Sequence, residues 1–268
     1  MFRFVALIFP VILSAQTGTA AIAARLERAN ALFQQGKLID ASAEVERILS
    51  AEPGNTRALE LKANCAYLNG NFSEARTTLI GVLDSHPNDE DAAYMLGRMY
   101  YQEGYIDQSI GLFQRVLKSN PKAFKAWDNL GLCYQALGSY EEATRHFLTA
   151  IKLVETDYPK YDWPYANLAD LLLKTGKPQM AYNAAAKAAE RNPLSARDFY
   201  LGGKALEELG RSELALSWLQ RSASLDPGYP EPWYLLARMY KKSGDTGKAD
   251  ESRRKFSELS AKAPAKKR

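Results

Sequence analysis

The sequence predicts an all-α fold, an α-solenoid in which about seven helix–turn–helix hairpins stack into a right-handed superhelix. Three observations predict it. Glycines recur 34 residues apart at Gly36, Gly70, Gly104 and Gly138, and again at Gly176, Gly210 and Gly244. Apolar residues between these markers have helical spacing, as in Trp127, Leu130, Gly131 and Tyr134. Two further positions hold small residues in every unit: Ala29, Ala63, Gly97, Gly131, Ala169, Gly203 and Ala237, then Ala41, Ala75, Ser109, Ala143, Ala181, Ala215 and Ala249.

The N-terminal residues have the pattern of a targeting segment. Arg3 precedes an apolar run over residues 4–13, and small residues follow it, which is typical of a secretory signal peptide. We expect residues 1–20 to form this signal, with cleavage after Ala15 or Ala20, and the mature protein to be periplasmic or secreted. The apolar run is shorter than the roughly 20 residues that span a bilayer. The alternative is a hydrophobic N-terminal helix that is retained as an anchor.

The repeats follow over residues 22–261. We expect each glycine to end the first helix of its unit in the left-handed conformation. Capping signals at Asn71–Glu74 and Ser139–Glu142 and a proline at Pro178 predict where second helices begin. Prolines such as Pro53 should close the second helices. The predicted units are 22–55, 56–89, 90–123, 124–161, 162–195, 196–229 and 230–261.

These residues resemble the tetratricopeptide repeat (TPR) family. The fourth unit carries the whole family pattern in Trp127, Leu130, Gly131, Tyr134, Ala143 and Phe147. The first unit departs from it, because Arg25 and Arg28 stand where an aromatic residue and a leucine are usual. The extra residues 155–161 predict either a rim loop that grips a partner or a local change of superhelix pitch.

The chain ends in polar sequence. The last predicted helix is rich in charged residues, and Arg253 takes a position that is Phe113 or Phe147 in inner units, which suits a solvated terminal cap. Residues 262–268 predict a basic disordered tail. The chain has 35 basic and 31 acidic residues; taking away Arg3 and the four basic residues of the tail leaves 30 against 31. The repeats are thus charge-balanced, and selectivity must come from local patches.

The sequence offers little for catalysis. The two histidines, His86 and His146, have no metal-ligand partners at suitable spacing on their helices. Cys65 and Cys133 lie two repeats apart, too far for a disulfide, and we expect both to be buried core residues. No phosphate-binding loop, nucleophile elbow or dinucleotide fingerprint is present. We therefore expect no enzyme activity, no cofactor and no metal.

The TPR resemblance implies that the first helix of each hairpin lines a concave groove that binds peptides. An aromatic ladder of Phe33, Tyr67 and Tyr101 beside amide and guanidinium donors suits a peptide backbone. A basic group in the later repeats suits an acidic segment. The alternative for each aromatic residue is simple packing between helices. The candidate groove residues are Asn30, Phe33, Asn64, Tyr67, Tyr94, Arg98, Tyr101, Lys125, Arg197, Tyr200, Lys204, Tyr234, Arg238 and Lys241.

The function that these patterns predict is a non-enzymatic scaffold that binds a protein or peptide in its groove outside the cytoplasm. A chaperone-type carboxylate clamp is not reproduced, because Leu26, Leu61, Met95 and Asp91 occupy its positions. One alternative is a structural or assembly component of a bacterial envelope complex (pilus, secretion or wall synthesis) that docks through both faces. Another is a carbohydrate-binding or enzyme-associated module. We expect no nucleic-acid partner, and membrane contact only through an uncleaved signal segment or the basic tail.

Overall fold

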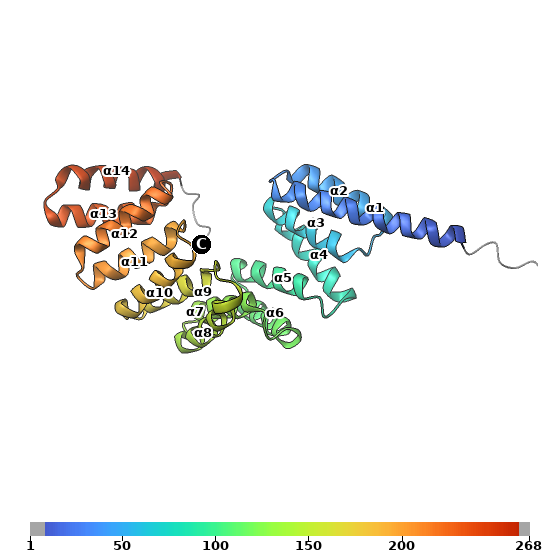
Figure 1. Ribbon diagram of the computed structural model, residues 1–268, viewed down its shortest axis with the longest axis horizontal. Helices are drawn as coiled ribbons and strands as arrows, with labels where there is room; N and C mark the ends of the chain where they lie inside the picture. The colour runs from blue at the N-terminus through green and yellow to red at the C-terminus, as the bar shows by residue number, and fades with distance from the viewer. Residues whose placement is uncertain (1–8, 263–268) are drawn as a thin grey trace, which may run out of the picture. The chain divides into compact units, whose positions relative to one another are not determined.

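The computed structural model describes residues 9–262, with side chains from residue 20 onward. Over this range the chain forms fourteen helices and no strand, which confirms the predicted all-α fold (Figure 1). The helices divide into two compact units, one ending at Asn120 and one beginning at Pro121, and each is described by itself.

The first unit consists of three antiparallel helical hairpins, formed by α1 with α2, α3 with α4, and α5 with α6. Each hairpin packs on the next through the α2–α3 and α4–α5 contacts (Figure 1). The helices are α1 (Phe9–Gln34), α2 (Leu38–Ala51), α3 (Thr56–Leu68), α4 (Phe72–Ser85), α5 (Glu90–Glu103) and α6 (Ile106–Ser119). Helix α1 begins at Phe9, inside the segment that the sequence assigns to a signal peptide.

The second unit repeats this arrangement in four hairpins. Consecutive helices pack in pairs, and the hairpins pack on one another through α8–α9, α10–α11 and α12–α13. The helices are α7 (Phe124–Ala136), α8 (Tyr140–Asp157), α9 (Trp163–Lys174), α10 (Pro178–Arg191), α11 (Ala196–Glu208), α12 (Ser212–Leu225), α13 (Pro230–Ser243) and α14 (Thr246–Lys262). Lys262, which the sequence places in the disordered tail, is the last residue of α14, and the rest of that predicted tail lies outside the described residues.

The repeated glycines end the first helices as predicted. All seven have positive φ, from 69° at Gly176 to 85° at Gly244, and no other described residue does. A residue with a Cβ is strained there, so glycine keeps the turn between two antiparallel helices short. The second helices also end where expected; α2 stops at Ala51, two residues before Pro53.

The two predicted capping signals differ in outcome. Asn71 caps α4, because its Oδ1 accepts from the Glu74 amide at 3.4 Å and its Nδ2 donates to Glu74 Oε2 at 2.7 Å. Ser139 is the N-cap residue of α8, so this helix begins where predicted, but its hydroxyl makes no capping bond and Glu142 pairs with Arg145 instead. The backbone angles of Asn71 and Ser139 are nearly equal, so the longer asparagine side chain reaches the amide and the serine does not. Pro178 stands in the first turn of α10, as predicted.

The small positions let the two helices of a hairpin meet closely. A Cβ built on Gly131 would lie 2.4 Å from Phe147 Cε1, and one on Gly97 would lie 2.9 Å from Phe113 Cε1. Both phenylalanines are fully buried. In these two hairpins the core therefore depends on a large ring that fills the space left by a missing side chain.

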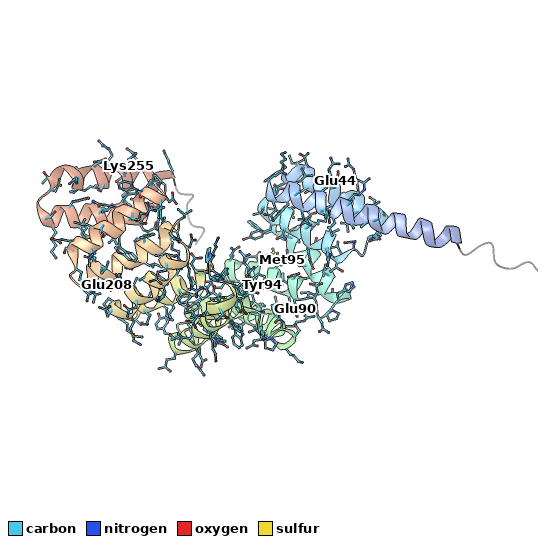
Figure 2. The ribbon with its side chains drawn as sticks, viewed as in Figure 1. Glu44, Glu90, Tyr94, Met95, Glu208 and Lys255 are labelled. Carbon is cyan, nitrogen blue, oxygen red and sulfur yellow. The ribbon has the colours of Figure 1, made fainter. Side chains whose placement is uncertain are left out.

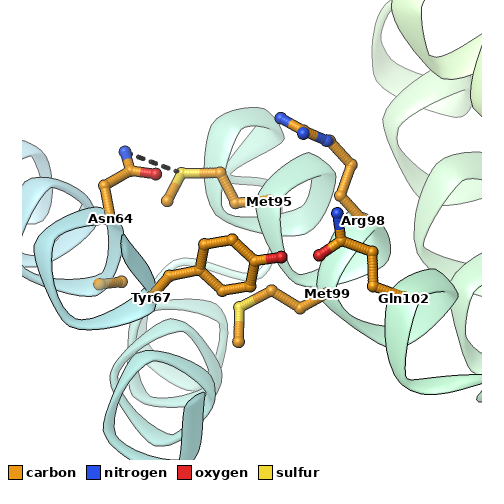
Figure 3. Close-up of a pocket in the computed structure, with 7 residues that line it drawn as sticks. Asn64, Tyr67, Met95, Arg98, Met99 and Gln102 are labelled. Atoms are coloured by element: carbon orange, nitrogen blue, oxygen red, sulfur yellow. Dashed lines mark hydrogen bonds between the residues drawn. The ribbon is translucent and has the colours of Figure 1, made fainter. Parts of the chain in front are cut away.

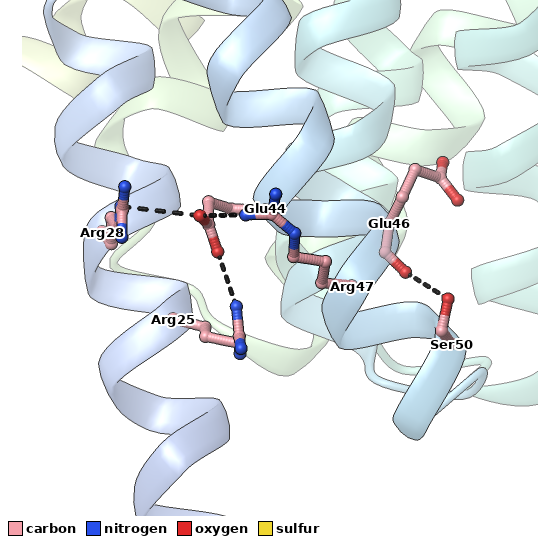
Figure 4. A network of polar contacts seen from close by, with 6 residues as sticks. All are labelled: Arg25, Arg28, Glu44, Glu46, Arg47 and Ser50. Carbon is pink, nitrogen blue, oxygen red and sulfur yellow. Dashed lines mark hydrogen bonds and ion pairs between the residues drawn. The ribbon is translucent and has the colours of Figure 1, made fainter.

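In the first hairpin, the two arginines that depart from the family pattern form ion pairs with a glutamate (Figure 4). Glu44 of α2 is only 2% exposed, and its carboxylate lies 3.0 Å from Arg25 Nη1, 3.5 Å from Arg28 Nε and 2.6 Å from Arg47 Nη1. Arg25 and Arg28 belong to α1, so a buried charge cluster replaces part of the apolar contact between α1 and α2.

The extra residues of the fourth unit lengthen a helix. Helix α8 has 18 residues where α6 has 14. The connector that follows packs inward, with the ring centroids of Tyr158 and Tyr161 at 4.4 and 4.8 Å from that of Phe124. The insertion therefore extends α8 and covers the start of α7.

The histidine and cysteine side chains have structural surroundings. Cys65 and Cys133 are buried, as predicted, and neither forms a disulfide. The ring of His146 stacks on Trp127 and on Tyr134, with centroids 5.4 and 5.0 Å away, and its burial lowers the pKa of the imidazole. Between residues 9 and 262 no group of three or more His, Cys, Asp or Glu side chains is arranged to hold a metal ion.

Candidate functional site

A small pocket opens between α3 and α5 in the first unit (Figure 3). Its volume is about 50 Å³, enough for one small apolar group. Both helices are the first of their hairpins, so the pocket lies on the side where the groove is expected. Figure 2 labels Tyr94 and Met95, which lie on the α5 side. The lining residues are Ala63, Asn64, Tyr67, Met95, Arg98, Met99 and Gln102.

The walls combine apolar surface with a few polar atoms. The Tyr67 ring lies between the helices, next to the side chains of Met95 and Met99 (Figure 3), and meets Phe72 edge-on with centroids 5.2 Å apart. Asn64 Nδ2 donates to Met95 Sδ at 3.8 Å, a weak bond that leaves the amide available for a stronger acceptor. Thioether side chains adapt to irregular apolar ligands. The pocket is therefore suited to one apolar side chain with polar contacts around it.

Three of the residues singled out from the sequence line this pocket: Asn64, Tyr67 and Arg98. Sequence reasoning missed Met95, Met99 and Gln102. Their spacing of four and three residues puts them on one face of α5, a signal that was readable but that does not separate a groove face from a core face.

The other members of the predicted ladder lie elsewhere in the unit. Asn30 Nδ2 donates to the Leu26 carbonyl of its own helix at 2.9 Å, and Phe33 packs against the core of α1 and α2. Tyr94 packs on Phe113 with centroids 5.9 Å apart, and the half-buried Tyr101 is outside the pocket lining. The alternative of packing between helices therefore describes Phe33 and Tyr94.

An acidic cluster adjoins the pocket at the N-terminal ends of α3 and α5. Glu60 lies one helical turn before Asn64, and Asp91 one turn before Met95. Asp89 caps α5 by accepting from the Ala92 amide at 2.8 Å. Burial, together with the neighbouring Asp89 and Asp91, raises the pKa of Glu60 to about 8, while Arg57 opposes the shift. The charged form of Glu60 is therefore disfavoured here, and a cation placed beside the three carboxyl groups would favour it.

The basic group of the later repeats is partly engaged within the second unit. Arg197 Nη2 donates to Asn167 Oδ1 at 2.8 Å, and its guanidinium carbon lies 5.6 Å from the Trp163 ring centroid. Arg238 pairs with Glu207 at 2.6 Å. The Tyr200 ring packs on Tyr229. Of the remaining candidates in this unit, Lys204 is half-buried, and Lys125, Tyr234 and Lys241 are exposed.

Arg197 belongs to a buried polar network that crosses three first helices. Asn167 of α9 donates from Nδ2 to Asp128 Oδ1 of α7 at 2.9 Å and accepts from Arg197 of α11. Burial raises the pKa of Asp128 to about 7, although the bond from Asn167 and the charge of Arg197 oppose the shift. Such a network, buried at Asp128 and Asn167 and half-buried at Arg197, fixes the relative placement of the three helices.

These features define the class of protein: an all-α repeat protein built of helical hairpins that pack one on the next. A family model described as the tetratricopeptide repeat protein 21 C-terminal ARM domain matches residues 34–197, well over half the chain. Two models described as tetratricopeptide repeats match residues 167–230 and 230–262. The chain belongs to the tetratricopeptide repeat family, whose members typically serve as protein–protein interaction scaffolds.

Known relatives agree in fold and diverge in sequence. A protein described as "Protein CTR9 homolog" from Arabidopsis thaliana is 27% identical over 121 residues, which are 45% of this chain and only 11% of that protein. A structure of pilF from Pseudomonas aeruginosa has a TM-score of 0.70 at 18% identity, covering 83% of this chain and 99% of that one. The APC/C Cut9–Hcn1 structure has a TM-score of 0.73 at 17% identity, covering 81% and 42%. At these identities the structures establish the fold alone.

Proposed function

We propose that this protein binds a peptide segment of a partner protein in the groove between α3 and α5, outside the cytoplasm and without enzymatic activity. The pocket of Asn64, Tyr67, Met95, Arg98 and Met99 supports the proposal. An apolar side chain of the peptide enters the space between Tyr67 and the two methionines. The Asn64 amide and the Arg98 guanidinium bond to peptide carbonyl groups.

The export part of the proposal depends on the N-terminal sequence. Residues 1–20 have the order of charge, apolar run and small residues that signal peptides have. Among the described side chains, those packed in the core of the first hairpin begin at Ile22, after both predicted cleavage points. Cleavage would thus shorten α1 and keep every described side chain that packs in this core. In the part of the chain that the structure covers, no helix is both long and apolar enough to cross a bilayer.

A double variant tests the groove. Full-length protein carrying Tyr67→Ala and Arg98→Ala should lose the partner that wild-type protein captures from an envelope fraction, as identified by mass spectrometry and confirmed by titration with that purified partner. The matched control is Tyr140→Ala with Arg145→Ala, which removes the same side chains from the exposed start of α8. Capture that survives the pocket variant at wild-type affinity would show that the partner binds elsewhere.

A second candidate function, assembly of an envelope complex through both faces, is favoured by a second groove. Ile80, Leu83 and Leu112 line an open hollow of about 390 Å³ on the side of the second helices α4 and α6. Ile80 is partly exposed there. Such a surface is suited to an apolar helix of a structural partner. Ile80→Glu should abolish co-fractionation with envelope complexes if this face docks, and should leave peptide binding at the α3–α5 pocket unchanged.

A further inference from the structure

The groove between α3 and α5 is chemically polarised along its length. On α3 the residues Glu60, Asn64 and Tyr67 follow one another at helical spacing on one face. On α5 the residues Asp91, Met95 and Arg98 do the same. The bond from Asn64 to Met95 and the shared pocket lining join the two rows side by side. The site therefore runs from acidic side chains through an apolar pocket to a guanidinium.

The acidic end is short of positive charge. Glu60 is half-buried with two aspartates beside it, and Arg57 is the basic group that acts on it. The other basic residue of α3, Lys62, pairs instead with Glu46 of α2 at 2.7 Å. Three carboxyl groups lie together here, and burial and the two aspartates raise the pKa of Glu60. A cation that approaches them stabilises their charged forms.

The opposite end would repel such a cation. Arg98 is exposed, and its guanidinium carbon lies 5.9 Å from the ring centroid of Tyr94, so its charge stays near the groove. A ligand cation is thus favoured at Glu60 and Asp91 and disfavoured at Arg98. This asymmetry selects both composition and direction in a bound peptide.

We infer that the occupant of the groove is an extended peptide segment that carries a lysine or arginine two or three residues from an apolar anchor side chain. The anchor enters the pocket between Tyr67 and Met99, and the basic side chain pairs with Glu60 and Asp91. The spacing follows from geometry: seven residues of helix from Glu60 to Tyr67 rise about 10 Å, which an extended chain covers in about three residues. This inference rests on the proposed peptide-binding function.

A random peptide display selection on the full-length protein tests it. Wild-type protein should enrich peptides with a basic residue two or three positions from an apolar one. For a fluorescent peptide of that consensus, replacing its basic residue with glutamine should weaken binding about tenfold, the worth of one charge-assisted bond. The variant Glu60→Gln with Asp91→Asn should bind both peptides equally. The control Glu251→Gln with Glu258→Gln makes the same charge change on exposed positions of α14 and should keep the preference.

The outcomes separate this inference from the function on which it rests. A consensus without a basic residue, or a preference that the Glu60→Gln/Asp91→Asn variant retains, overturns the inference while peptide binding stands. A selection that enriches no peptide, or only peptides whose affinity is unchanged by Tyr67→Ala, overturns peptide binding at this pocket as well.

Discussion

Glycines at two places in this chain have opposite consequences for stability. Gly131 faces Phe147 so closely that an added Cβ would lie 2.4 Å from the ring, whereas Gly111 of α6 has nothing within 4 Å of the same position. We expect Gly131→Ala to lower the free energy of unfolding by about 1–3 kcal/mol through overpacking. Gly111→Ala should raise it by about 0.5–1 kcal/mol through helix propensity. Urea denaturation measures both, and equal effects would contradict this packing argument.

Asp198 makes stability depend on pH. This carboxyl is 1% exposed, and burial, followed by the neighbouring Asp162, raises its pKa from 3.8 to about 7. Because the folded pKa is the higher one, the group's contribution to stability is fully present below pH 3.8 and is lost as the pH rises through 7.

The substitution Asp198→Asn removes this dependence. We expect the variant to exceed wild type in free energy of unfolding by about 2 kcal/mol more at pH 8 than at pH 5, because asparagine cannot ionise in this buried place beside Asp162. Asp250→Asn, on the exposed face of α14, serves as the control and should change little between the two values. A pH profile for Asp198→Asn that runs parallel to wild type would show that Asp198 does not carry the effect.

At the scale of elements, the first hairpin combines its apolar core with a cluster of ion pairs. Glu44 is nearly inaccessible, and three arginines from α1 and α2 surround its carboxylate. Glu44→Gln should lower the free energy of unfolding by about 1–3 kcal/mol, less than for a fully buried pair because the arginines are largely solvated. Glu46→Gln, the adjacent exposed carboxylate paired with Lys62, should cost less than about 0.5 kcal/mol.

The destabilisation caused by Glu44→Gln should be confined to the first hairpin. Since Arg25 and Arg28 bind Glu44 from α1, amide hydrogen exchange should speed up over residues 20–34 in Glu44→Gln and stay unchanged in the helices of the second unit. Uniform acceleration along the chain would mean that the cluster supports global folding and not the docking of one helix.

The elements were largely predictable because their determinants are local. A glycine that must adopt positive φ and a proline that ends a helix act within a few residues, so the 34-residue period marks the helix pairs. The capping of α8 was not predictable in this way: Ser139 and Asn71 have nearly the same backbone angles, and the length of one side chain decides whether the bond forms. The role of Arg25 and Arg28 likewise depends on Glu44, which belongs to another helix.

At the scale of the whole molecule, the repeat register predicted the site only in part. It selected Asn64, Tyr67 and Arg98, which line one pocket, because equivalent positions of successive first helices face the same side. It could not separate Phe33 and Tyr94, which pack in the core, from Tyr67, which lines the pocket. Met95 and Met99 were missed for the same reason: the gap that they fill exists only once α3 and α5 are packed together.

At the scale of the whole molecule, thermal stability can show whether residues 1–20 belong to the folded protein. Arg25 binds Glu44, and Ile22 and Leu26 pack in the first hairpin, so the fold uses described side chains of α1 that follow both predicted cleavage points. We expect removal of residues 1–20 to leave the Tm unchanged within about 2 °C. Removal of residues 1–26 should lower it by several degrees, as the loss of two apolar contacts and an ion pair costs a few kcal/mol. Thermal unfolding by circular dichroism compares the two, and the mass of protein recovered from the periplasm should correspond to a chain that starts at Gln16 or Ala21. A large loss of Tm on removing residues 1–20 would instead mean that the segment belongs to the fold and is retained.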